Sequence, residues 1–281
     1  MPGPYFFGPS VMTDSTFSKL QELPDSDQMP FLFVGHGNPM NAILDTKYGR
    51  EWARIGKELP KPTAILAISA HWLTPGSTRV LTVDVPRTIH DFGGFPQELF
   101  DQQYPAPGSP EFAKKTIELI RKTEAVEDFR WGLDHGTWSV LNKMYPNADI
   151  PVYQLSIDYS KPPEYHYQLA KDLVQLRSHG VLILGSGNIV HNLTAIGRSY
   201  DWAAEFDGIM EQHLSSHNHE GVVDFLKLGE LARLAHPTHD HFLPLIYSIG
   251  LQTECDEITY FNDSFDFGTV SMRSVLAMPA S

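Results

Sequence analysis

Three apolar segments that lead into a histidine constrain the fold more than any other feature of the sequence. These segments are residues 31–35 before His36, residues 64–70 before His71, and residues 181–185 a few positions ahead of His191. Continuous apolar runs of this length are typical of sheet strands that are covered on both faces. An open α/β sheet has its ligand site at the carboxyl ends of its strands, so histidines that follow such strands can meet although they are far apart in sequence. The pattern therefore predicts an α/β protein in which three imidazoles converge.

The remaining segments predict the helices and further strands of such a fold. Helices are expected in residues 41–59, 109–121, 164–178, 201–215, 222–234 and 242–249 and in a segment that ends near residue 145, and strands in residues 78–83, 151–157 and 268–277. At 281 residues the chain could form one domain or two, but it contains no internal repeat and no convincing linker. We therefore predict a single α/β domain, residues 29–281, with a central, mostly parallel or mixed sheet flanked by helices, after an N-terminal extension of residues 1–28.

Composition and charge limit the partners and the compartment. The chain has 21 Lys and Arg against 34 Asp and Glu, and this formal net charge of −13 argues against nucleic acid and against an anionic membrane surface as partners. No apolar run approaches the roughly 18 residues that span a bilayer, and the first residues lack the pattern of a secretory signal. With one cysteine, Cys255, the chain can form neither an internal disulfide nor a thiolate metal site, which fits a cytoplasmic protein.

The histidines that follow the strands are candidate metal ligands, because neutral imidazole is the commonest metal ligand in proteins. A single histidine at a strand end is more often a hydrogen-bonded structural residue, but three of them beside small residues, such as the glycines around His36, favour a shared metal site. His241 is a fourth candidate, and His236 and His239 are nearby rivals. Asp240 could instead supply a carboxylate, which would give a two-histidine, one-carboxylate iron site.

Other histidines are candidates for catalysis or for purely structural roles. His135 follows Asp134 in a predicted turn, where an imidazole with a pKa near neutrality suits acid–base catalysis; a helix-capping loop is the structural alternative. His90 and Asp91 could orient a substrate or line a pocket, and a structural role fits their positions equally well. No role is predicted for the histidines of polar segments that we expect to be exposed, which are His166, His179, His213, His217 and His219.

Seven motifs, in order along the chain, together resemble one enzyme family. They are residues 35–40 (GHGNPM), 69–72 (SAHW), 90–96 (HDFGGFP), 104–108 (YPAPG), 134–138 (DHGTW), 186–192 (SGNIVHN) and 237–241 (PTHDH). With these motifs the chain, from about residue 30 to its end, resembles the class III (LigB-like) extradiol ring-opening dioxygenases, and within them the 4,5-DOPA dioxygenase extradiol branch. Members of this family have a single α/β domain with a central sheet, which agrees with the fold predicted above.

The resemblance implies a reaction and a set of site residues. The implied ligands of one divalent metal ion are His36, His71 and His191, with His241 as a further ligand or as an acid–base group. The implied catalytic residues are His135 and His241, and the residues expected to contact the substrate are Trp72, His90, Asp91 and Phe95. The reaction would open the ring of a DOPA-like or caffeate-like catechol with O2 to give a semialdehyde acid. Fe(II) would be the metal that supports ring opening and Zn(II) the metal often found bound, and histidine ligands suit both ions.

Two other functions fit the same residues. A zinc-dependent hydrolase is one, because histidine-bound zinc with an open coordination position activates water. A non-catalytic metal-binding protein is the other, and it would take up metal without turning over any catechol. Consumption of O2 with a catechol favours the dioxygenase, whereas metal-dependent cleavage of an ester or amide favours the hydrolase. The particular catechol depends on pocket contacts that the sequence leaves open, and homo-oligomerisation stays open as well.

Overall fold

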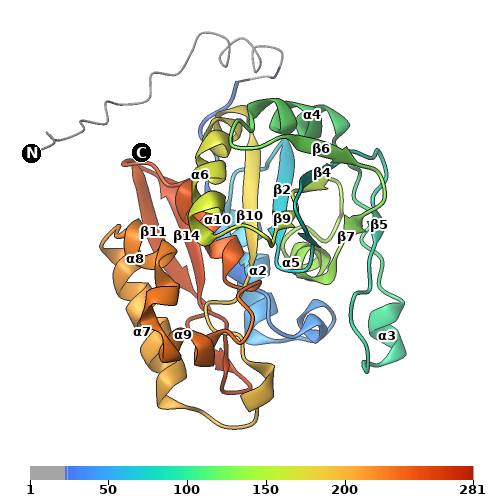
Figure 1. The fold of residues 1–281 in the computed structure, drawn as a ribbon. Helices are drawn as coiled ribbons and strands as arrows, with labels where there is room; N and C mark the ends of the chain where they lie inside the picture. Colours follow the sequence, from blue (N-terminus) through green and yellow to red (C-terminus); the bar gives the residue numbers. More distant parts are fainter. Residues whose placement is uncertain (1–22, 24, 281) are drawn as a thin grey trace, which may run out of the picture.

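The computed structural model, which describes residue 23 and residues 25–280, has a six-stranded mixed sheet at its centre (Figure 1). The strands in spatial order are β11 (Asp256–Phe261), β14 (Ser274–Pro279), β1 (Phe31–Gly35), β10 (Val181–Gly187), β2 (Ala64–Ser69) and β8 (Val152–Gln154). β1, β10, β2 and β8 run parallel, whereas β14 is antiparallel to both β1 and β11. The prediction of a single α/β domain with a central mixed sheet is confirmed.

The three strands that lead to the histidines are neighbours in this sheet, and their carboxyl ends are in register. Gly35 of β1 pairs with Gly187 of β10, and Ser186 of β10 pairs with Ser69 of β2. The backbone N–H of His36 donates to the carbonyl of Gly187 at 3.1 Å, so the ladder between β1 and β10 continues into the histidine. The chain therefore leaves all three strands at one edge of the sheet, where α/β proteins have their ligand sites.

Helices cover both faces of the sheet, and successive residues of a central strand face opposite layers. In β1, Phe31 and Phe33 belong to one hydrophobic cluster, whereas Leu32 and Val34 belong to the other. The first cluster contains side chains of α4 (Pro110–Leu119), α6 (Pro163–Leu173) and α10 (Leu243–Gly250), and the second contains side chains of α2 (Lys47–Glu58) and α5 (His135–Met144). Because both faces are covered, the central strands are apolar along most of their length.

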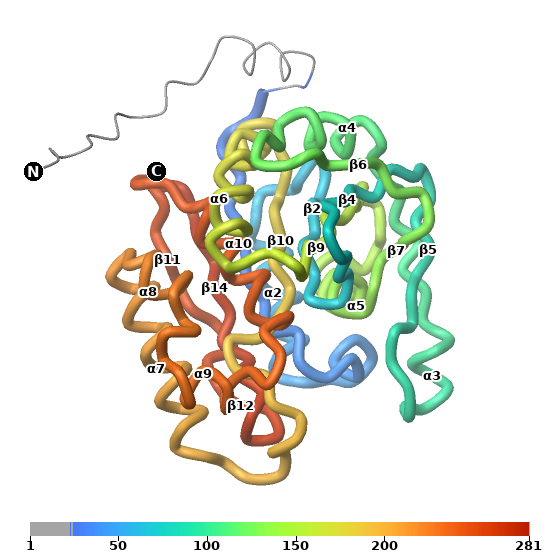
Figure 2. The backbone as a smooth tube through the Cα atoms, in the orientation of Figure 1, coloured from blue at the N-terminus to red at the C-terminus, as the bar shows by residue number. Residues whose placement is uncertain are grey.

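A group of helices from the last third of the chain lies beside β11 and β14 (Figure 2). The long helix of this group is α7 (Asp201–Ser215), as the sequence predicts. The predicted helix of residues 222–234 is instead divided into α8 (His219–Val223), η4 (Phe225–Leu228) and α9 (Glu230–Ala235). Gly229 lies between the last two with a φ of 61°, a conformation that glycine adopts readily, and it ends the helical path there.

Short elements complete the fold. They are η1 (Pro39–Ala42), β3 (Leu73–Thr74), β4 (Thr78–Leu81), β5 (Arg87–Thr88), α3 (Gln97–Phe100), β6 (Ala125–Asp128), β7 (Gly132–Leu133), β9 (Ile157–Asp158), η2 (Val174–His179), η3 (Leu193–Ala195), β12 (Phe265–Asp266) and β13 (Val270–Ser271). The predicted strand of residues 151–157 is split, because β8 pairs with β2 in the main sheet while β9 pairs with β3 outside it. Strand β11 at the sheet edge was not predicted.

Most of the predicted N-terminal extension, residues 1–22 and 24, lies outside the described residues. Of the remainder, Leu23 is buried, and the N–H of Ser26 donates to the carbonyl of Ser178 at 2.8 Å. The helices found in residues 25–280 are all too short or too polar to cross a membrane.

Candidate metal centre

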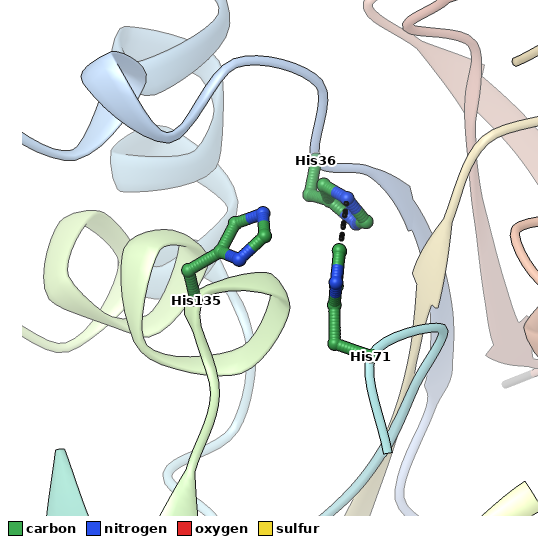
Figure 3. Close-up of side chains that lie close together, drawn as sticks. All are labelled: His36, His71 and His135. Carbon is green, nitrogen blue, oxygen red and sulfur yellow. Dashed lines mark hydrogen bonds between the residues drawn. The ribbon is translucent and has the colours of Figure 1, made fainter. Parts of the chain in front are cut away.

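Five histidines line one cavity at the carboxyl edge of the central strands. They are His36, His71, His135, His191 and His241, and the cavity has a volume of about 310 Å³. Three of them, His36, His71 and His135, each offer a ring nitrogen, and these nitrogens all lie within 4.8 Å of one another. Figure 3 shows these three rings gathered around one space, each carried by a different part of the chain. The structure thus brings together the histidines that the sequence singled out.

Each histidine is held at the end of a secondary-structure element. His36 directly follows β1, His71 lies two residues after the last residue of β2, and His191 lies a few residues after β10. His135 is the first residue of α5, on one face of the sheet, and His241 precedes α10 on the other face. The site is therefore formed by the carboxyl ends of the central strands and by segments from both helical layers.

A glycine at the end of β10 allows the His241 segment to approach the sheet. A Cβ atom on Gly187 would lie 2.1 Å from the carbonyl oxygen of His241, so a larger residue would displace this segment. The N–H of Asn188 donates to the same carbonyl at 2.9 Å and fixes the approach. This close contact is what the glycine-rich turn after β10 provides.

Hydrogen bonds determine which nitrogen of His36 carries the hydrogen. Its Nδ1 lies 3.0 Å from the hydroxyl of Ser186, and this hydroxyl donates to the carbonyl of Gly136 at 2.6 Å. A hydroxyl has one hydrogen to donate, so Ser186 accepts from the Nδ1–H of His36. The lone pair of the His36 ring is therefore on Nε2, on the opposite side of the ring.

His71 has the same arrangement with a carboxylate in place of the hydroxyl. Its Nδ1 lies 3.1 Å from Oδ2 of Asp91, and an ionised carboxylate only accepts, so Nδ1 carries the hydrogen. The Nε2 of His71 is then the free nitrogen, and it lies 3.2 Å from the Nε2 of His36. Two lone pairs face each other at this distance, which is favourable only with a proton or a cation between them.

A divalent metal ion fits this pair of nitrogens. Two nitrogens that bind one tetrahedral ion at 2.0–2.1 Å lie about 3.3 Å apart, and the two Nε2 atoms of His36 and His71 lie 3.2 Å apart. In both rings the other nitrogen is held by a polar partner, which is how histidine ligands are oriented in metalloproteins. The residues present therefore suit a metal ion held by imidazoles.

Asp91 contacts a second histidine of the cluster. Its Oδ1 lies 3.0 Å from Nδ1 of His135 and accepts from the backbone N–H of His135 at 2.9 Å. The rings of His71 and His135 are consequently close, with their centroids 3.9 Å apart. The Asp91 carboxylate thus holds both rings, and the expectation that it also contacts the substrate stays a prediction.

His191 and His241 form a stacked pair on another side of the cavity. Their ring centroids are 3.5 Å apart and their planes differ by 5°. The Nδ1 of His241 donates to the carboxylate of Asp240 at 2.5 Å, which leaves its Nε2 free. The centroid of the His241 ring lies 5.3 Å from that of the His36 ring. The Asp240 carboxylate, the alternative ligand considered from the sequence, is thus engaged by His241, and the ligand roles of His191 and His241 stay predictions.

Burial keeps most of these imidazoles neutral. Burial and the neighbouring imidazoles lower the pKa of His36 well below its ordinary value of 6.5, and burial lowers the pKa of His191 to about 4. The pKa of His241 is also lowered well below the ordinary range, chiefly by burial. For His71 burial lowers the pKa, but the bond to Asp91 and the surrounding carboxylates outweigh it and raise the pKa. Neutral imidazole is the form that binds a metal.

Four residues were expected to contact the substrate, and of these Phe95 is among the described residues that line the cavity. Trp72 is buried and stacks on Trp131, with ring centroids 5.6 Å apart and planes 5° apart. The Nε2–H of His90 donates to the carbonyl of Gln102 at 2.9 Å. Neither Trp72 nor His90 reaches the described cavity wall, so their contact with a substrate is a prediction that this geometry does not favour.

The expectation that His166 and His179 are exposed is wrong. Both are buried, and the Nδ1 of His166 lies 3.0 Å from the hydroxyl of Tyr247, which joins α6 to α10. His166 lies three and seven residues before Leu169 and Leu173, two buried residues of the same helix. This helical spacing was a signal for its burial that the polar neighbours obscured.

Sequence reasoning missed several residues of the site. Ser186, which orients His36, is a polar residue inside an apolar strand, and this contrast is a usable signal because buried polar groups need partners. The outer wall of the cavity was missed as well, and it is formed by Asn38, Pro39, Leu193, Ile196, Phe267 and Val270. These residues come from loops and from elements of two to four residues, which are too short for a periodic pattern to indicate which side chains face the cavity.

Comparison with known proteins gives a family. Residues 32–271 match the family described as the catalytic LigB subunit of aromatic ring-opening dioxygenase. A relative from Escherichia coli (strain K12) named 4,5-DOPA dioxygenase extradiol is 44% identical over 259 residues, which are 89% of this chain and 95% of the relative. One of the same name from Beta vulgaris is 39% identical, over 86% of this chain and 94% of the relative. The crystal structure of an uncharacterized protein from Escherichia coli K12 superimposes with a TM-score of 0.77 at 39% identity, covering 88% and 99% of the two chains.

The chain belongs to the LigB family of aromatic ring-opening dioxygenases. It is an extradiol dioxygenase, an enzyme whose substrates are a small aromatic molecule and O2. Family membership and the histidine cluster together favour this activity over the zinc hydrolase and over the non-catalytic metal-binding protein.

Proposed function

We propose that the protein uses Fe(II) to open the ring of a catechol that carries a side chain, of the DOPA or caffeate kind, and forms a semialdehyde acid. Both atoms of O2 enter the product, so the reaction needs no external reductant. The observation that carries the metal site is the pair of free Nε2 atoms on His36 and His71, 3.2 Å apart, at the base of the cavity. The names of the relatives support the choice of catechol.

The ligands in this proposal are His36, His71 and His191, with His241 as a further ligand or as an acid–base group. All four line the same cavity, and three of their rings carry depressed pKa values that keep them neutral. When bound, Fe(II) supplies the means to hold both catechol oxygens and O2 and to pass electron density between them. Zinc is redox-inert, so the zinc-loaded protein should bind a catechol without opening it.

His135 is the proposed acid–base residue. Burial and the nearby His71 lower its pKa, so its imidazole is neutral near pH 7 and can accept the proton of a catechol hydroxyl. The Asp91 carboxylate, 3.0 Å from Nδ1, would then stabilise the imidazolium, which holds the proton until the opening ring is basic enough to take it back. Phe92 packs edge-to-face on His135 with centroids 5.5 Å apart, and with Phe95 it forms an aromatic wall that excludes water.

Anaerobic loading with Fe(II) followed by a panel of catechols tests the proposal. We expect O2 uptake together with a yellow ring-opened product, and no product from the zinc-loaded protein. His36→Ala should lose metal binding and turnover together. The control is His217→Asn, which changes an exposed histidine whose φ of 54° asparagine tolerates. Turnover that survives in His36→Ala would contradict the assigned role, and O2-independent ester cleavage would contradict the function.

We also infer a cytoplasmic location, because the single cysteine, Cys255, is free and such a chain fits a reducing compartment. Homo-oligomerisation stays a prediction.

A further inference from the structure

The wall of the cavity carries one polar side chain besides the histidines, and it belongs to Asn38. The other described lining residues are glycine, proline or apolar residues. At the mouth these are Leu193, Ile196 and Phe267, which are 57%, 53% and 46% exposed. A few polar groups on a largely apolar wall usually fix the orientation of a small-molecule ligand. Asn38 is therefore the described group that could contact a polar part of the substrate away from the histidines.

One hydrogen bond determines how the amide of Asn38 is turned. Asn38 directly precedes η1, and its Oδ1 accepts from the backbone N–H of Met40 at 2.9 Å. A backbone N–H only donates, so the amide atom that faces it is the oxygen, and the NH2 group lies on the other side of the amide.

The NH2 group of Asn38 has both of its hydrogens available. No described residue accepts a hydrogen bond from its Nδ2, and Nδ2 does not belong to the buried atoms that lack a partner in the described part of the chain. This nitrogen therefore reaches open space. Because Asn38 is half-buried and lines the cavity, its NH2 group can donate to a molecule bound there.

A tight turn holds Asn38 beside the metal site. Gly37, which separates it from His36, has a φ of 55°, and a Cβ atom at this position would collide with the Sδ of Met272. The turn and the bond to Met40 together fix the amide relative to the His36 ring. A donor that is already held in place loses little freedom when a ligand binds, so its hydrogen bond contributes more to the affinity.

The two ends of the proposed substrate need different partners. The ring oxygens would lie at the histidines, which supply the metal site and the acid–base group. A side chain opposite one ring hydroxyl extends away from them, and no Lys or Arg is among the described lining residues. A carboxylate on this side chain keeps part of its water at the half-exposed mouth, and it can accept from the amide of Asn38. Hydrogen bonds to a charged acceptor are stronger than those between neutral groups.

We propose that Asn38 is a specificity-determining residue, whose NH2 group donates a hydrogen bond to the carboxylate on the side chain of the substrate. This inference rests on the proposed function and adds a contact to it. DOPA-like and caffeate-like catechols both carry such a carboxylate, and Asn38 favours their binding over that of catechols whose side chain has no acceptor.

Asn38→Ser tests this contact without adding a charge. The serine oxygen can still accept from the N–H of Met40, but the shorter side chain has no donor at the position of Nδ2. The ligands are 3-(3,4-dihydroxyphenyl)propanoate and 4-propylcatechol, which have the same ring and a side chain of the same length and differ in the carboxylate. With Zn(II)-loaded protein under nitrogen, calorimetry gives both Kd values. We expect the variant to weaken binding of the acid, relative to 4-propylcatechol, about fivefold.

A second variant and a control complete the test. Asn38→Asp also keeps the acceptor for Met40, but it places a negative charge beside the carboxylate, so the relative affinity for the acid should fall about tenfold or more. The matched control is Asn218→Ser, because exposed Asn218 precedes α8 and accepts from the N–H of Gly221 at 3.1 Å. Its ratio of Kd values should equal that of the unaltered protein. With Fe(II)-loaded enzyme, the ratio of kcat/KM values should change in step.

An unchanged ratio in Asn38→Ser would overturn the inference. An equal loss of affinity for the acid, 4-propylcatechol and catechol itself would also overturn it, because that result places the amide at the ring oxygens. If the iron-loaded enzyme opens no catechol, the proposed function fails, whereas the Kd values on the zinc-loaded protein still decide the role of Asn38. If the zinc-loaded protein binds none of the three ligands, both fail.

Discussion

The nitrogen that a histidine offers to a metal is decided by the group that holds its other nitrogen. In this site the hydroxyl of Ser186 holds His36, and the carboxylate of Asp91 holds His71. Both leave Nε2 free, and both free nitrogens face the same point. Asp91 is the more consequential of the two partners, because one carboxylate contacts two rings of the cluster.

Asp91→Asn should therefore weaken metal binding. The amide has one acceptor oxygen, whereas the carboxylate accepts from the backbone N–H of His135 with Oδ1 and from Nδ1 of His71 with Oδ2, so one of these two contacts would be lost. We expect the affinity for Zn(II) to fall roughly 10–100-fold, as it does when other partners of histidine ligands are removed. A competition titration with a chromophoric chelator measures it.

Asp101→Asn is the matched control, since it removes one exposed carboxylate from the same segment of the chain. Its affinity for Zn(II) should equal that of the unaltered protein. An Asp91→Asn variant that also binds Zn(II) normally would show that Asp91 does not orient the ligands.

At the scale of elements, close approaches between backbones determine where the helices lie. The end of β10 meets the chain before α10, and α2 crosses α5 where a Cβ atom on Gly56 would lie 2.3 Å from the Met144 carbonyl oxygen. The second approach positions α5, whose first residue is His135. Packing between α2 and α5 thus affects the site from a distance.

Two glycine-to-alanine variants in helices separate packing from helix propensity. Gly56→Ala in α2 must displace the Met144 backbone, and overpacking of this kind costs about 1–3 kcal/mol. Gly208→Ala in α7 meets nothing within 4 Å, and it should stabilise the protein by roughly 0.5–1 kcal/mol through helix propensity. Urea unfolding measures both free energies, and a Gly56→Ala protein of undiminished stability would contradict the close contact.

His166 makes the contact between α6 and α10 sensitive to acid. Burial lowers its pKa to about 4, so between pH 6.5 and pH 4 the unfolded chain binds a proton here that the folded protein does not. The free energy of unfolding therefore rises with pH across this window, and the contribution is lost as the pH falls through it. For this single group the slope is at most about 1.4 kcal/mol per pH unit.

His166→Gln should remove this part of the pH dependence. At pH 7 the variant should be less stable than the unaltered protein, because it loses the contact between His166 and the hydroxyl of Tyr247. The difference in the free energy of unfolding should narrow toward pH 4. The histidines of the metal site contribute equally to both proteins and cancel in the comparison. Parallel pH profiles of the unfolding free energy, measured with urea in the presence of a chelator, would contradict the buried neutral state of His166.

For the molecule as a whole, local sequence patterns predicted the parts whose environment is uniform. β1, β2 and β10 are covered on both faces along their length, so their apolar runs revealed both the strands and the histidines that follow them. Strand β11 was missed because it is an edge strand of the sheet, with two exposed and two half-buried residues among its six, so its apolar pattern is weak.

The remaining differences depend on tertiary contacts that no short window contains. The predicted helix of residues 222–234 is interrupted at Gly229, whose backbone conformation cannot be read from the apolar spacing around it. The histidine cluster was predictable because strand ends converge in α/β sheets. The roles of Ser186, Asp91 and the side chains at the mouth of the cavity were not predicted. A polar serine inside an apolar strand indicates that it has a partner, but the identity of a partner distant in sequence appears only once the chain is folded.

The carboxyl ends of the central strands and both helical layers meet at the histidines, so a bound ion would connect all three parts of the fold. Anomalous diffraction at the iron edge, from crystals loaded anaerobically with Fe(II), tests this central claim most directly. We predict one strong peak per chain, within coordination distance of the Nε2 atoms of both His36 and His71. A peak bonded to neither nitrogen, or iron bound only at surface residues, would contradict it.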